Sequence, residues 1–122
     1  MTDYAAPRPP PTVVDLLAQA NPGNGPQWAH ESEDLDLTLL AWDSGRSVDP
    51  HVNDEVDVIC IGVEGTGTIR VNGEAHVLRP GVAVLIPKGA ERAIESGDER
   101  LRYLSIHRRR RGLRPTWKGR TV

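Results

Sequence analysis

Apolar and polar residues alternate along most of the chain from Gln27 onward, and a period of two is typical of β-strands. We predict strands at 35–42, 51–57 continued by an apolar run at 58–63, and at 68–71, 74–78, 82–86, 90–95 and 101–107. Asn72-Gly73 is the strongest hairpin signal, because both residues tolerate a positive φ. One short helix is expected from Thr12 to Ala20, where Thr12 and Asp15 resemble a capping box. About eight or nine short antiparallel strands predict an all-β fold that closes into a small barrel or jelly roll.

The chain has 122 residues, which is the length of one domain. Four prolines lie in residues 1–11, so we expect a disordered or extended arm there, followed by the domain at 12–107 and a basic tail at 108–122. No apolar stretch approaches the roughly 20 residues of a membrane span, and the first residues lack the apolar centre of a signal peptide. We expect a soluble, cytoplasmic protein without a membrane partner. The single cysteine, Cys60, lies mid-strand, where a buried and inert thiol is expected.

The formal net charge of −2 hides an uneven distribution. Nine acidic residues lie in 31–57, whereas 107–122 hold seven Arg or Lys and no acid. The Arg-rich run at 107–115 has no interleaved aromatic residues, and the chain has no nucleic-acid fold motif. We therefore expect the tail to be solvated, or docked on acidic strands of a partner subunit, and we do not expect nucleic acid binding.

Polar residues concentrate on one face of the predicted strand 51–57. Alternation places His51, Asn53, Glu55 and Asp57 together. If this face points into a barrel, their desolvation must be offset by a metal, by a ligand or by mutual hydrogen bonds. On an outer face they would be solvated and without function. The spacing alone leaves both interpretations open.

Two spaced motifs then resemble the cupin family of the RmlC-like jelly-roll superfamily. The first motif, at about 45–65, reads Gly45, five residues, His51-Val-Asn53, and a closing Gly65. The second, at about 81–96, reads Gly81, five residues, Pro87-x-Gly89, followed at the family's next positions by Arg92 and Ser96. The resemblance covers about residues 36–106. It implies a conical antiparallel jelly-roll barrel with one short N-terminal helix, and a homodimer, since small cupins commonly pair.

The resemblance also bears on the metal site, because cupins generally bind Fe, Mn, Ni or Zn through two His and a Glu of the first motif and a His of the second. His51 is kept, but Asn53 replaces the second His and Arg92 replaces the last one. The acidic position falls on Asp57 or on Val58 according to the spacing, with Glu55 as a substitute if the strand bulges. We therefore expect no metal cofactor. A divalent metal, if present, would be held by His51, Asn53 and Asp57.

Arg92 is open to three interpretations: an internal salt bridge to Asp57 or Glu55, an anchor for a carboxylate or phosphate ligand, or a neighbour of a retained metal. Tyr103, Ser105 and His107 alternate on the last strand and could face the same cavity.

These residues lead to a functional hypothesis, a cupin that binds a small anionic organic molecule through Arg92, with Asn53, Glu55, Tyr103 and His107 as further ligand contacts. His51 and Asp57, as a hydrogen-bonded pair, could move a proton. Whether the protein is an enzyme stays open. The alternatives are a metal-dependent oxygenase or isomerase with an altered ligand set, and a non-catalytic regulatory or interaction protein that uses the basic tail.

Overall fold

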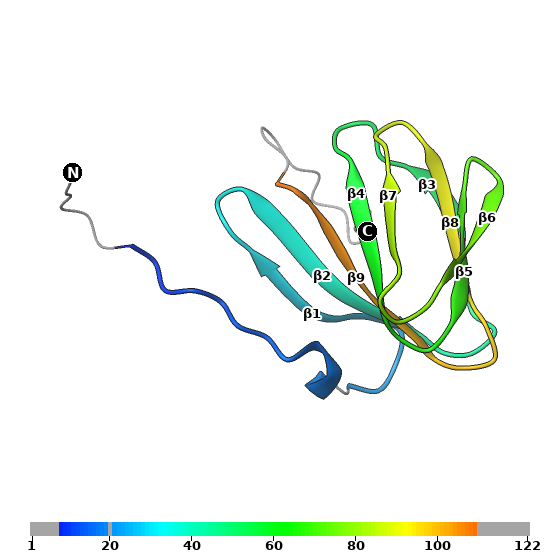
Figure 1. Ribbon diagram of the computed structural model, residues 1–122, viewed down its shortest axis with the longest axis horizontal. Coiled ribbons are helices and arrows are strands. Elements are labelled where there is room, and N and C mark those ends of the chain that lie inside the picture. Colours follow the sequence, from blue (N-terminus) through cyan, green and yellow to red (C-terminus); the bar gives the residue numbers. More distant parts are fainter. Residues whose placement is uncertain (1–7, 20, 110–122) are drawn as a thin grey trace.

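Two antiparallel β-sheets face one another in the computed structural model, which describes residues 8–19 and 21–109 (Figure 1). One sheet has the order β1-β2-β9-β4-β7 and the other β3-β8-β5-β6. The predicted all-β jelly-roll fold is confirmed. The elements are η1 (Leu16–Ala18), β1 (Gly25–Glu31), β2 (Leu35–Trp42), β3 (Ser47–Val52), β4 (Val58–Glu64), β5 (Gly67–Val71), β6 (Glu74–Leu78), β7 (Ala83–Ile86), β8 (Glu91–Ser96) and β9 (Leu101–Arg108).

The hairpin between β5 and β6 forms where the sequence predicts it. Asn72 has φ 51° and Gly73 has φ 85°, so both residues adopt the left-handed conformation of a two-residue turn. Val71 and Glu74 are directly opposed in the ladder on either side. This turn fixes the register of two of the four strands in the smaller sheet.

The predicted helix at 12–20 is wrong, since the segment forms only the short 3₁₀ turn η1. Asp15, rather than Thr12, is the N-cap, and its Oδ1 accepts from the backbone N of Leu17 at 3.1 Å and of Ala18 at 3.3 Å. The Arg102 guanidinium then donates to the carbonyls of Leu16, Leu17 and Gln19 at 2.7–3.2 Å. A continuing helix would need these carbonyls for its own hydrogen bonds, so tertiary bonding ends the helix.

Residues 8–15 have no regular secondary structure and lead away from the barrel (Figure 1). The disordered or extended arm expected at 1–11, and its boundary with the domain, stay predictions. Residues 1–7 of that arm, and 110–122 of the basic tail, lie outside the described residues. No helix in the described part of the chain is long and apolar enough to cross a membrane.

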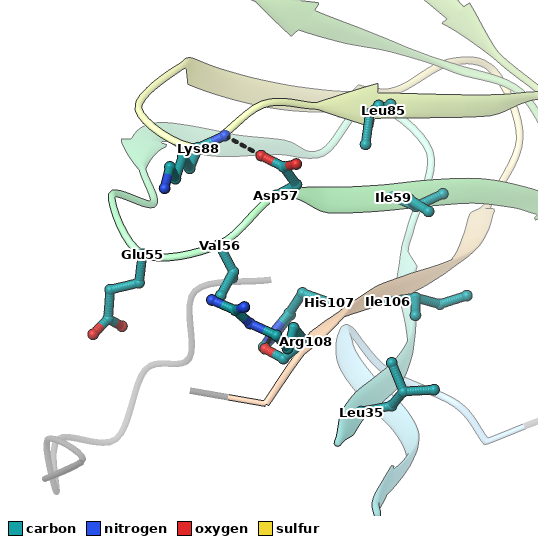
Figure 2. A pocket seen from close by; sticks show the side chains of 10 residues that line it. All are labelled: Leu35, Glu55, Val56, Asp57, Ile59, Leu85, Lys88, Ile106, His107 and Arg108. Carbon is teal, nitrogen blue, oxygen red and sulfur yellow. Dashed lines mark hydrogen bonds between the residues drawn. The ribbon is translucent and has the colours of Figure 1, made fainter. Parts of the chain in front are cut away.

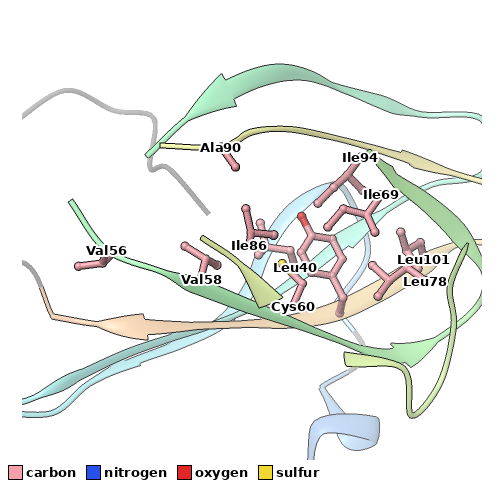
Figure 3. Packing of buried hydrophobic residues seen from close by; sticks show 11 residues of the cluster. Leu40, Val56, Val58, Cys60, Ile69, Leu78, Ile86, Ala90, Ile94 and Leu101 are labelled. Carbon is pink, nitrogen blue, oxygen red and sulfur yellow. The ribbon is translucent and has the colours of Figure 1, made fainter. Parts of the chain in front are cut away.

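The core lies between the two sheets. Both sheets contribute to one cluster of buried side chains (Figure 3): Leu40, Val56, Val58, Cys60, Ile69, Leu78, Ile86, Ala90, Ile94, Leu101 and Tyr103. Since alternate residues of a strand share a face, Leu40 and Tyr103 identify the inward-facing positions of β2 and β9. These positions locate the site.

Candidate functional site

Arg92 brings a positive charge into the barrel. It lies on β8, is 2% exposed, and stands opposite His51 of β3 in the sheet register. His51 is half-buried, and its Nδ1 lies 3.4 Å from the carbonyl oxygen of Asp49. The two residues are therefore neighbours in the smaller sheet, rather than on strands that face each other across the barrel as the alignment of the two motifs predicts.

The predicted strand 51–57 is wrong beyond Val52, because residues 53–57 form a loop. The Asn53 side chain is buried, and its Oδ1 accepts from the backbone N of Glu55 at 2.9 Å and of Val56 at 3.2 Å. A local side-chain bond of this kind competes with the strand ladder and turns the chain. The residues of 51–57 consequently do not share one face.

The loop places the two acidic candidates outside the core. Asp57 is exposed, and its Oδ1 accepts from the backbone N of Lys88 at 2.8 Å. Among the described residues it pairs with neither His51 nor Arg92, so the expected His51–Asp57 hydrogen bond and the Arg92–Asp57 salt bridge do not form. Glu55 is exposed as well.

The larger sheet supplies three inward-facing pairs between β2 and β9. Asp36 is opposite His107, Thr38 opposite Ser105, and Leu40 opposite Tyr103. All six side chains are buried. The Trp42 indole Nε1–H donates to the Tyr103 hydroxyl oxygen at 3.2 Å. Tyr103 and His107, two of the predicted ligand contacts, are thus inside the barrel.

Sequence reasoning missed Asp36 and Thr38 as site residues. The leucines at 35, 37 and 39 suggest an inward apolar face, but the even-numbered face carries Leu40 into the core. The sequence held one sign of the true inner face. Leu40 and Trp42 are apolar and lie on the same face of the strand as Asp36 and Thr38, not on the face of the three leucines.

Burial and the Arg92 charge act in opposite directions on the neighbouring acidic groups. Burial raises the pKa of the Cys60 thiol from 9.0 to about 11, and the positive charge of Arg92 opposes this rise. Burial also raises the pKa of Tyr103, with a smaller increase from Cys60, against the Trp42 hydrogen bond and the Arg92 charge. The thiol is therefore protonated and inert at neutral pH, as expected, and Arg92 reduces, without cancelling, the cost of a negative charge at these two groups.

Two buried hydrogen-bond donors of the site have no partner. Asn53 Nδ2 and Ser105 Oγ are buried and make no hydrogen bond within the described part of the chain. Leaving a buried donor unsatisfied costs roughly 1–3 kcal/mol, so such groups need an explanation in a stable protein. A bound acceptor would satisfy both.

The donors present do not fit the metal site that the fold implies. A cation such as Arg92 disfavours a metal at the position of the missing His, and the Asn53 amide oxygen is already an acceptor for two backbone N–H groups. Asp57 binds the Lys88 backbone on the outside. Across residues 8–19 and 21–109 no group of three or more His, Cys, Asp or Glu could hold a metal ion.

A pocket of about 430 Å³ opens beside the loop 53–57 (Figure 2). It has His107 among its lining residues and extends over the outer face of the larger sheet. Its apolar side consists of Leu35, Ile59, Leu85 and Ile106, and its charged rim of Glu55, Asp57, Lys88 and Arg108.

Comparison with known proteins agrees with this architecture. The family model described as "Cupin domain" matches residues 38–107. Dimethylsulfoniopropionate lyase DddW from Ruegeria pomeroyi is 33% identical over 70 residues, which are 57% of this chain and 45% of that protein. The chain thus spans less than half the length of this curated relative.

Solved structures show the same fold. TT1209 from Thermus thermophilus has a TM-score of 0.68 and 26% identity over 79% of this chain and 95% of that one. BH2720 from Bacillus halodurans has a TM-score of 0.72 and 21% identity over 88% of both chains.

Proposed function

This chain belongs to the cupin-domain family, and we propose that its barrel binds a small anionic organic molecule with Arg92 as the anchor. The observation that carries the proposal is the buried guanidinium, whose charge opposes the rise that burial causes in the pKa of Cys60 and Tyr103. A guanidinium binds a carboxylate or phosphate through two parallel hydrogen bonds. In an apolar barrel that interaction is screened far less than in water.

The polar groups around Arg92 complete the binding hypothesis. Asn53 Nδ2 and Ser105 Oγ are buried donors that an anionic oxygen would satisfy. The Tyr103 hydroxyl already accepts from Trp42 and keeps its own proton free to donate. His51 and His107 supply imidazole groups from the two opposite sheets. Donors outnumber acceptors in this set, which favours an anion over a cation.

Titration with three simple anions tests the proposal: acetate, benzoate and inorganic phosphate. The readouts are the Arg92 Nε–H signal in the ¹H–¹⁵N spectrum and the thermal midpoint. We expect at least one anion to shift the signal and to raise the midpoint. In Arg92→Gln the rise should vanish. Arg70→Gln is the matched control, because Arg70 lies on the neighbouring strand β5 but is half-exposed and pairs with Glu95. Indifference of the wild-type protein to all three anions would overturn the proposal.

Metal analysis separates this proposal from the metal-dependent alternative. Protein purified without an affinity tag should contain no stoichiometric Fe, Mn, Ni or Zn. Stoichiometric metal that is retained on dialysis and lost in His51→Ala would instead favour the alternative.

A second candidate function is a lyase acting on a small carboxylate, and the likeness to dimethylsulfoniopropionate lyase favours it. Arg92 would hold the carboxylate, and an imidazole of the barrel would accept a proton. Incubation with dimethylsulfoniopropionate, followed by NMR of the remaining substrate, tests it. Consumption by the wild-type protein and by Arg70→Gln, but not by Arg92→Gln, would support the lyase. No consumption would leave binding as the function.

A further inference from the structure

A buried carboxylate and a buried imidazole face each other at the mouth of the barrel, outside the Arg92 cluster. Asp36 is 1% exposed and His107 is 6% exposed. They are direct partners in the β2–β9 ladder, and Asp36 Oδ2 lies 3.9 Å from His107 Nε2. Two titratable side chains this deeply buried have strongly coupled charges, because the protein interior screens them weakly.

The second ring nitrogen fixes the tautomer. His107 Nδ1 lies 2.9 Å from the carbonyl oxygen of Arg108. A carbonyl oxygen only accepts, so Nδ1 carries a proton in this contact. Nε2 is then the atom that faces Asp36. An unprotonated Nε2 would direct its lone pair at the carboxylate, which is repulsive, whereas a protonated Nε2 gives an attractive ion pair.

We propose that Asp36 holds His107 as an imidazolium at neutral pH, so that the two buried side chains carry no net charge until His107 loses its Nε2 proton and leaves the carboxylate uncompensated. Asp36 is the residue that sets this protonation state. After the proton is lost, the ring is the neutral Nδ1–H tautomer and keeps its bond to the Arg108 carbonyl.

Other charged groups around the ring act in both directions. Glu55 and Asp57 favour the imidazolium, and Arg92, Lys88 and Arg108 oppose it, with His51 on the facing sheet. Asp36 differs from all the acids of this set because its carboxylate is buried and within 4 Å of the ring. Glu55 and Asp57 are exposed, and water screens them. Burial of the ring opposes the imidazolium, and among the acids named here Asp36 provides the strongest attraction to it.

The ring nitrogens can be observed directly in the ligand-free protein, so this test is independent of the anion-binding proposal. Long-range ¹H–¹⁵N spectra of ¹⁵N-labelled protein distinguish an imidazolium from either neutral tautomer. We expect His107 to keep both ring protons at a pH where a short histidine-containing peptide in the same buffer is already neutral. His107→Gln identifies the signal.

Two variants test whether the Asp36 carboxylate itself, rather than any nearby negative charge, keeps the His107 ring protonated. Asp36→Asn has nearly the same shape, and in it His107 should become the neutral Nδ1–H tautomer at pH 7. Asp57→Asn is the matched control and should leave the His107 signals unchanged. The proposal is wrong if His107 of the wild-type protein loses its second ring proton together with the reference peptide, a result that requires no variant to fold. It is also wrong if Asp57→Asn has the same effect as Asp36→Asn.

Discussion

Replacing Arg92 by methionine tests whether the guanidinium is held for an external ligand or stabilises the fold by pairing with an acid of its own chain. The guanidinium is 2% exposed, and methionine fills a similar volume without a charge. Exchanging a buried ionic group for a well-packed apolar side chain is often neutral or stabilising by about 1–4 kcal/mol, whereas removing one partner of an internal ion pair costs about 3–5 kcal/mol. If Arg92 is held in the barrel for an external anion, the ligand-free Arg92→Met protein should be as stable as the wild type, or up to about 3 kcal/mol more stable.

Arg102 is the matched comparison, because it is the other buried arginine of the described chain and is 3% exposed. It donates to Glu64 Oε1 at 2.7 Å and to three backbone carbonyls that fix the N-terminal segment. Hydrogen bonds to a charged group contribute roughly 1.5–3 kcal/mol each, but the freed carbonyls and Glu64 regain water, so Arg102→Met should lose about 2–4 kcal/mol.

Urea unfolding at pH 7, followed by tryptophan fluorescence, measures both variants. The expected result is a loss of stability in Arg102→Met and either no change or a gain in Arg92→Met. A loss of about 3 kcal/mol or more in Arg92→Met would refute the reasoning, because it would mean that Arg92 neutralises a buried acid of its own chain.

Three further predictions follow from the structure. Asn53→Asp should keep the two backbone bonds of Oδ1 and remove the Nδ2 donor, so titration should show that anion binding is lost while the fold persists; retained affinity would exclude Asn53 from the site. Because burial raises the pKa of Cys60 from 9.0 to about 11, unfolding releases a proton in that interval, and stability should fall by about 1.4 kcal/mol per pH unit between pH 9 and 11. Cys60→Ala should flatten that slope by one proton in urea titrations, and an unchanged slope would contradict the assignment. We also propose that the homodimer pairs through the outer face of the larger sheet, where Leu85 is 62% exposed beside Ile59 and Leu35. In sedimentation experiments Leu85→Arg should give monomers and Val77→Arg should not, since Val77 is 57% exposed on the other sheet; dimers in both variants would disprove this interface.

Local chemistry explains which parts of the fold could be predicted. Asn72-Gly73 determines its hairpin by itself, since few other residues adopt its backbone angles. Thr12 and Asn53 show the limit of the same reasoning. The Thr12 prediction failed because the start of η1 depends on Asp15 and its end on Arg102, a residue far away in the sequence. The Asn53 prediction failed because a side-chain bond to the local backbone outweighed a pattern of alternation that otherwise fits a strand.

The residues of the site also divide into those that the sequence could identify and those that it could not. Motif spacing could identify Arg92 and His51 as site residues, although not as neighbours in one sheet. Asp36 could not be identified, because β2 carries apolar residues on both faces: Leu39 is fully buried on one and Leu40 on the other. When both faces of a strand are covered, alternation no longer identifies the inner one. Only the pairing of β2 with β9 brings Asp36 to His107.

The distribution of polarity along the barrel determines what the site can accept. Toward the mouth the inward-facing pairs are Asp36–His107 and Thr38–Ser105, and deeper in the barrel Leu101 and Ile94 replace them. For an anion that reaches Arg92 between these pairs, the Asp36 carboxylate is repulsive unless the charge of His107 compensates. The protonation state of His107 would then control entry. Anion affinity should fall as His107 loses its proton, even though the charge of Arg92 does not change with pH in that range. Asp36→Asn removes both the repelling charge and the imidazolium, so its affinity for acetate should be nearly independent of pH. A wild-type affinity that is equally flat would mean that the anion does not pass between these two residues.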